Sequence, residues 1–93
     1  MRRGRRVVAP HLVLHVMTRP EPMVPRAGFV VGKMVGNSVH RHRVIRQLRH
    51  LTAAQLPAFP PGTDIVVRAL PGALSADLAA ELSTLLKRAG LHA

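Results

Sequence analysis

The segment from residue 36 to residue 51 limits the possible folds more than any other part of the chain. On a helical wheel of about 100° per residue it divides into two faces. The apolar side chains gather on one of them, at Val44, Ile45, Leu48 and Leu51. The opposite face carries basic side chains, at His42, Arg43, Arg46, Arg49 and His50. Such a helix must pack its apolar face against another element, and its cationic face then stays exposed.

The limits of this helix are marked by residues that start and stop helices. Asn37 or Ser38 is a suitable N-cap, since either side chain can accept a hydrogen bond from the first turn. The segment from Pro57 to Gly62 is rich in proline and ends the helix. We therefore expect a helix from residue 37 or 38 to about Gln55.

Segments rich in β-forming residues lie on both sides of this helix. Residues 7–17, broken early by Pro10, and residues 28–33 and 64–69 are expected strands. Within the first, residues 11–16 alternate, with Leu12, Leu14 and Val16 on one face and His11, Val13 and His15 on the other. The second face is polar enough to meet solvent or a ligand. Residues 18–26 hold three prolines and form a loop, and a hairpin joining residues 11–16 to residues 28–33 is the simplest topology.

A second helix is expected near the end of the chain. Ser75 is the expected cap, Asp77 lies in the first turn and Gly90 is the expected C′ residue. The order β-β-β-α-β-α predicts an α+β fold, with two helices on one small sheet of three to four strands. At this length, residues 1–93 should form a single domain, with residues 1–6 as a basic arm.

The charge balance points to a polyanionic partner. The formal net charge is +10, from 14 Lys and Arg against 4 Asp and Glu, and 12 of the cations are Arg. Arg binds phosphate through two parallel hydrogen bonds and stacks on bases, which favours nucleic acid over an anionic membrane. Phe29 and Phe59 are the aromatic residues, too few for a sheet of base-stacking platforms. No apolar run has transmembrane length and no signal-peptide cleavage pattern follows the basic start, so we expect a cytoplasmic protein with no membrane partner.

A solvated basic helix face is the plainer interpretation of residues 41–50. Two observations favour nucleic-acid binding: this helix contains no Asp or Glu to pair with its arginines, and the whole chain shares the positive excess. If about five phosphates are neutralised, log K should fall with log salt with a slope of roughly −3.5 to −4.5.

The residues from Phe29 to Arg49 closely resemble the signature of the bacterial ribonuclease P protein subunit, particularly that of actinobacterial members. The family pattern is a strand, a Lys, Gly-Asn-Ala-Val, an Arg-Asn-Arg core and then Arg-x-x-Arg. The matching positions are Lys33, Gly36, Asn37, Val39, Arg41, Arg43, Arg46 and Arg49. The resemblance implies a ribosomal-protein-like fold with a left-handed strand-helix-strand crossover, whereas the general rule predicts the right-handed form.

The resemblance also implies a function and a site. The protein would assist 5′ maturation of tRNA as an accessory subunit, binding the catalytic RNA and the 5′ leader of precursor tRNA, with no obligate protein partner. Catalysis would belong to the RNA and its Mg²⁺, with no catalytic or metal-binding residue in the protein. The RNA-binding residues would be Lys33, Asn37, Arg41, His42, Arg43, Arg46, Arg49 and His50. The leader cleft would contain Val13, His15, Arg41 and Arg68, with Arg41 reaching over the sheet from the apolar edge of the helix.

This chain departs from the family pattern in four places. His42 stands where the core has Asn, and Ile45 and Met34 stand at basic positions. Members also carry a helix before the first strand that supplies aromatics to the leader cleft, whereas this sequence starts at Met1-Arg-Arg-Gly-Arg-Arg, where that helix should have ended. A shortened product, a misassigned start codon and a natural short form all remain open, and each predicts weaker leader binding.

Two other functions remain as alternatives. A general structured-RNA-binding or ribosomal-type protein would bind many folded RNAs without preferring a tRNA that carries a leader. A DNA-binding helix protein is disfavoured, because no helix-turn pattern precedes the basic helix and no dimerising seam is present.

Overall fold

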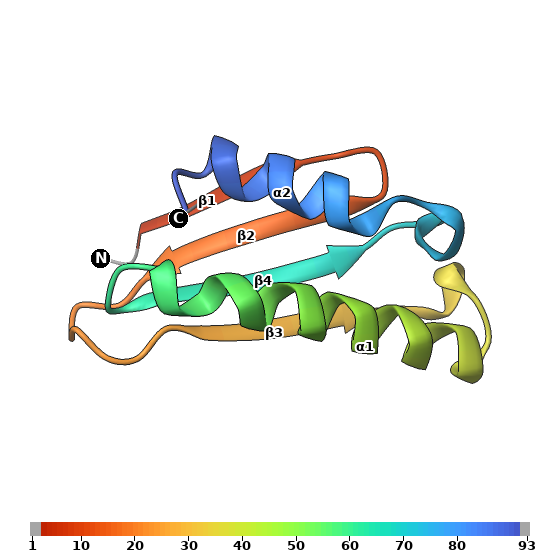
Figure 1. Ribbon diagram of the computed structural model, residues 1–93, viewed down its shortest axis with the longest axis horizontal. Helices are drawn as coiled ribbons and strands as arrows, with labels where there is room; N and C mark the ends of the chain where they lie inside the picture. Colours follow the sequence, from red (N-terminus) through yellow and green to blue (C-terminus); the bar gives the residue numbers. More distant parts are fainter. Residues whose placement is uncertain (1–2, 92–93) are drawn as a thin grey trace.

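The computed structural model describes residues 3–91. It confirms the expected α+β fold and the order β-β-β-α-β-α (Figure 1). The strands and helices are β1 (Arg3–Val8), β2 (Leu12–Thr18), β3 (Arg26–Val31), α1 (Ser38–Gln55), β4 (Thr63–Ala69) and α2 (Leu78–Arg88), with short 3₁₀ turns η1 (Lys33–Val35), η2 (Leu56–Ala58) and η3 (Ala73–Ser75).

The four strands form one sheet in the order β1-β2-β4-β3. β2 pairs antiparallel with β1 and with β4, and β3 pairs parallel with β4. The expected hairpin between β2 and β3 is therefore wrong. β4, with four of its seven residues buried, takes the central place between them, and the proline-rich loop is long enough to carry the chain past it.

The chain at residues 3–6 forms part of a strand and is not the free basic arm that we expected. β1 extends back to Arg3 and pairs along its length with β2, and residues 1 and 2 lie outside the described residues. Arg5 Nη2 donates to the Ala89 carbonyl at 2.7 Å, which ties this edge strand to the end of α2. Charged side chains on an edge strand also oppose pairing with a second chain.

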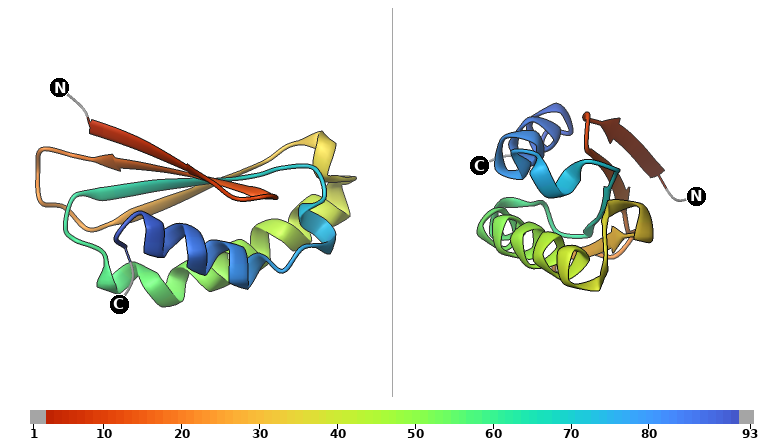
Figure 2. Two further views of the ribbon diagram at one scale, coloured as in Figure 1. Left: turned by 90° about the horizontal axis from the view of Figure 1, so that it is seen from above. Right: turned by 90° about the vertical axis from the view of Figure 1, so that its right-hand side faces the viewer.

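The β3-α1-β4 connection is left-handed, as the resemblance implied. In Figure 1 the chain runs along β3, returns as α1 in front of the sheet and re-enters along β4 above β3. Figure 2 shows both helices on the same side of the sheet. The general preference for right-handed crossovers is therefore overridden in this fold.

The core lies between the sheet and these two helices. Leu12 and Leu14 of β2 and Val67 of β4 are fully buried there, and α2 contributes Leu78, Leu82, Leu85 and Leu86. Successive residues of a strand point to opposite faces, so Val13, His15 and Arg68 lie on the face that the helices leave open.

The N-cap of α2 is Asp77, and our assignment of Ser75 is wrong. Asp77 Oδ1 accepts a hydrogen bond from the Ala80 amide at 3.1 Å, whereas Ser75 ends the 3₁₀ turn η3. A carboxylate at this position also interacts favourably with the helix dipole, which a serine hydroxyl does less well. Gly90 has a φ of +74°, as expected for a C′ glycine.

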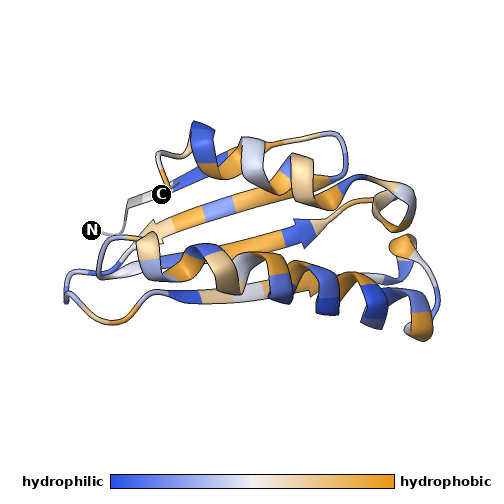
Figure 3. Ribbon diagram, viewed as in Figure 1, coloured by the Kyte–Doolittle hydropathy of each residue, from blue (hydrophilic) through white to orange (hydrophobic). Residues whose placement is uncertain are grey.

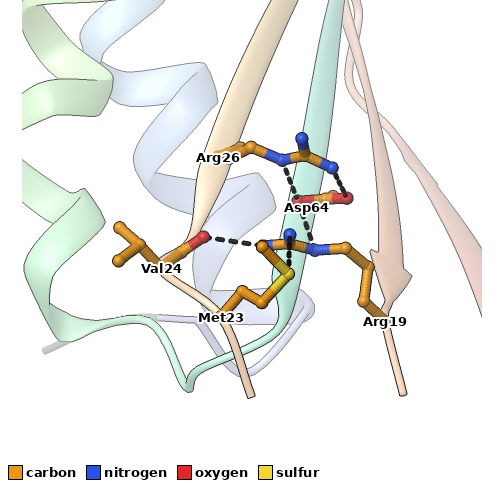
Figure 4. Close-up of polar contacts among 5 residues, drawn as sticks. All are labelled: Arg19, Met23, Val24, Arg26 and Asp64. Carbon is orange, nitrogen blue, oxygen red and sulfur yellow. Dashed lines mark hydrogen bonds and ion pairs between the residues drawn. The ribbon is translucent and has the colours of Figure 1, made fainter. Parts of the chain in front are cut away.

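One carboxylate joins the proline-rich loop to the sheet (Figure 4). Asp64 lies 3.2 Å from Arg19 Nε and 3.1 Å from Arg26 Nη2, and Arg19 also donates to the Val24 carbonyl at 2.6 Å. The hydrogen bond from Arg26 to Asp64, with the charge of Asp64, raises the pKa of Arg26 above its ordinary value. The loop between β2 and β3 is thereby held against the start of β4.

Candidate nucleic-acid interface

The helix α1 has the two faces that its sequence predicts. Asn37 is the N-cap, and its Oδ1 accepts a hydrogen bond from the His40 amide at 2.9 Å. Val44, Leu48 and Thr52 are buried against the sheet, and Ile45 and Leu51 are half-buried beside them. Figure 3 shows the hydrophilic and hydrophobic positions alternating along the helix. Five exposed side chains, which we call the basic face, lie opposite: His42, Arg43, Arg46, Arg49 and His50.

Two shallow hollows lie between the side chains of the basic face. One, of about 450 Å³, is lined by Ser38, Val39, His42, Arg43 and Arg46. The other, of about 690 Å³, is lined by Arg43, Arg46, Gln47, Arg49, His50 and Ala53. Arg43 and Arg46 border both hollows, so they form the centre of a continuous cationic surface.

The arginines of α1 have no carboxylate partners within residues 3–91. The ion pairs found there join His11 to Glu81 and Asp64 to Arg19 and Arg26, all away from α1. An exposed row of arginines without counter-charges repels itself and attracts a polyanion. Lys33, in the turn η1 just before the helix, is exposed and extends the same positive charge.

The open face of the sheet carries a separate hollow of about 450 Å³. Its lining contains three residues that we expected there, Val13, His15 and Arg68, and three that we did not, Arg6, Val8 and Leu70. In the register of the sheet, Arg6 pairs with His15, and Val8 pairs with Val13. The sequence signal for Arg6 and Val8 is the turn at Pro10. A hairpin across this turn pairs residues 3–8 with residues 13–18 and brings both side chains to the face of Val13 and His15. We call this the sheet-face hollow.

Arg41 does not line the sheet-face hollow, in contrast to our expectation. The helix α1 packs on the covered face of the sheet, whereas the hollow lies on the open face. Arg41 is half-buried at the edge of α1, and its Nε is buried without a hydrogen-bond partner among the described residues. Arg41 Nε is therefore an unsatisfied donor, and burying such a donor is costly.

Two further kinds of feature are absent from residues 3–91. No group of three or more His, Cys, Asp or Glu side chains there could hold a metal ion. No helix in that range is long and apolar enough to cross a membrane.

Comparison with known proteins identifies the family. The model of the family described as Ribonuclease P matches residues 1–90. The chain belongs to the ribonuclease P protein family. As a ribonuclease P protein component, it is an accessory subunit of the ribonucleoprotein endoribonuclease that matures the 5′ end of tRNA.

Curated ribonuclease P proteins and a solved structure agree with this assignment. The ribonuclease P protein component of Streptomyces bikiniensis is 48% identical over 99 residues, covering 95% of this chain and 80% of that protein. The one from Mycobacterium sp. (strain KMS) is 50% identical over 91 residues, covering 94% and 77%. The RNase P protein of Staphylococcus aureus superposes with a TM-score of 0.87 at 25% identity, covering 97% of this chain and 84% of that chain.

Proposed function

We propose that the two surfaces of this ribonuclease P protein bind two different RNAs. The basic face of α1 holds the catalytic RNA, and the sheet-face hollow binds the 5′ leader of precursor tRNA. The observation that carries this proposal is the placement of the two surfaces: one lies on the outer side of a helix, and the other lies on the opposite face of the sheet that the helix covers. Two RNAs can therefore be bound at once without competing.

The basic face suits folded RNA because it is rigid. Its arginines stand on a helix that is anchored by buried Val44 and Leu48, so little backbone entropy is lost on binding. Each arginine that neutralises a phosphate releases a counterion, which drives association. Lys33 and the amide N–H donors of Asn37 add contacts at the N-terminus of α1, where the helix dipole also favours an anion.

The sheet-face hollow suits an extended single strand. Val8, Val13 and Leu70 give it an apolar floor, while Arg6 and Arg68 supply positive charge. Bases can lie on the apolar floor and on the His15 ring, and the backbone phosphates can reach the two guanidinium groups. These contacts do not read base edges in a duplex groove, so we expect weak sequence preference in the leader.

The bond cleavage itself is assigned to the RNA subunit. Mg²⁺ bound by that RNA would activate the attacking water and stabilise the leaving oxygen. The carboxylates of the chain are Glu21, Asp64, Asp77 and Glu81, and within residues 3–91 they form no group of three or more metal ligands, alone or with histidines. Asp64 and Glu81 are engaged by Arg and His side chains. The protein's contribution is to position the precursor and to neutralise phosphate charge. A protein with this role would act in the cytoplasm.

Reconstitution with a ribonuclease P RNA tests the proposal. The protein alone should not cleave precursor tRNA, and its addition to the RNA should lower the Mg²⁺ concentration needed for half-maximal processing. The gain should be larger for a precursor with a 5′ leader than for one whose leader is a single nucleotide. Cleavage by the protein alone would refute the non-catalytic role. Equal stimulation of both precursors would refute the leader site and indicate a general structured-RNA-binding protein.

A further inference from the structure

The two exposed histidines of the basic face occupy equivalent places. His42 borders one hollow together with Arg43 and Arg46, and His50 borders the other with the same two arginines. Each imidazole therefore lies beside the place that an RNA phosphate held by those arginines would occupy.

We propose that His42 and His50 bind RNA phosphates as imidazolium groups, so that the protein takes up protons when it binds RNA. The inference rests on the proposed role of the basic face. Histidine is the side chain whose charge changes between about pH 5 and about pH 8. Neighbouring cations disfavour the charged imidazole and neighbouring anions favour it. Phosphates held by Arg43 and Arg46 would lie beside both rings, so the complex would hold more protons than its separated parts.

No carboxylate within residues 3–91 can replace the phosphate as the counter-charge. The elements packed against α1 carry Lys33 on η1, Arg26 on β3, and on α2 or at its N-cap Asp77, Glu81, Lys87 and Arg88. Asp77 caps α2, Glu81 accepts from His11 Nδ1 at 2.7 Å, and neither lines a hollow of the basic face.

His40 provides an internal comparison on the same helix. It is half-buried and packs against Gly36, where an added Cβ would lie 2.9 Å from the His40 Cβ. It lines neither hollow of the basic face. We therefore expect His40 to contribute nothing to proton uptake, although it lies two residues from His42.

Binding of the ribonuclease P RNA, without precursor tRNA, should be measured between about pH 6 and about pH 8 at constant salt. The slope of log K against pH equals minus the number of protons taken up. Each imidazolium adds one phosphate contact, which is about fivefold to eightfold in affinity at 0.1 M salt. The wild-type protein should bind more tightly at the lower pH by that factor for each histidine. His42→Asn and His50→Asn should each remove the gain in affinity due to one histidine, and the double variant should remove the pH dependence.

Three controls separate the possible failures. Circular dichroism at both pH values shows that each variant is folded, and His40→Asn should retain the wild-type pH dependence. At the lower pH the salt slope should become more negative by roughly 0.7 to 0.9 for each protonated histidine, a change that a structural role would not produce. Absence of salt-dependent RNA binding at every pH would refute the proposed function itself. Binding with equal affinity at both pH values, or pH dependence that survives in the double variant, would overturn only the proton-linked contacts.

Discussion

Replacement of single arginines on the basic face should change the salt dependence of RNA binding by a predictable amount. Arg46 borders both hollows and Arg49 borders one, and both side chains are exposed and unpaired with any carboxylate in the described part of the chain. Loss of one phosphate contact removes roughly 0.7 to 0.9 from the slope of log K against log salt. Relative to the wild-type protein, the variant should therefore lose affinity about fivefold to eightfold at 0.1 M salt and almost none at 1 M salt.

The measurement is a titration of labelled ribonuclease P RNA with Arg46→Ala and Arg49→Ala at several salt concentrations. Arg26→Ala is the matched control, because it removes the same charge from another edge of the molecule, and Arg19 remains beside Asp64 at 3.2 Å. We expect the two α1 variants to flatten the slope by about one unit each and the control to leave it nearly unchanged. An equal change in all three variants would show that net charge, and not the basic face, determines binding.

Three further predictions concern the leader site and the fold. His15→Ala should leave affinity for the catalytic RNA unchanged and reduce the preference for leader-bearing precursor, measured by competition between precursors with and without leaders; equal losses in both measurements would contradict two separate surfaces. Leu48→Ala removes a side chain with 0% exposure and should cost about 2 to 5 kcal/mol in urea unfolding, whereas Ala53→Ser on the exposed face should cost little. Asp64→Asn should cost about 1 to 3 kcal/mol, because Arg19 loses its carboxylate partner, and unchanged stability would show that the loop does not depend on this contact.

The parts of the fold that depend on local sequence could be predicted, and the parts that depend on distant pairing could not. The faces of α1 follow from a period of 3.6 residues, and its N-cap follows from Asn37, so both were accessible from one segment. The position of β4 between β2 and β3 depends on which strands bury each other best, and adjacency in sequence favoured the wrong pair. The parallel pairing of β3 with β4 was missed for the same reason.

The candidate site shows the same division. The basic face was predicted completely, because all its members lie on one helix. The sheet-face hollow was predicted only in part, since Arg6 and Val8 join it through the register of β1 with β2. Arg41 was placed on the wrong side because a helical wheel gives the direction of a side chain around its own axis and not the face of the sheet on which the helix lies.

The absence of acidic residues from α1 also affects the protein before it meets RNA. Arg43, Arg46 and Arg49 follow one another at intervals of three residues, and like charges at that spacing disfavour a helix by about 0.2 to 0.5 kcal/mol per pair. The unbound subunit therefore carries a small charge repulsion along α1, which a bound polyanion such as RNA would relieve. RNA that binds only the folded subunit adds to its stability by mass action, so the unbound copies are the less stable ones.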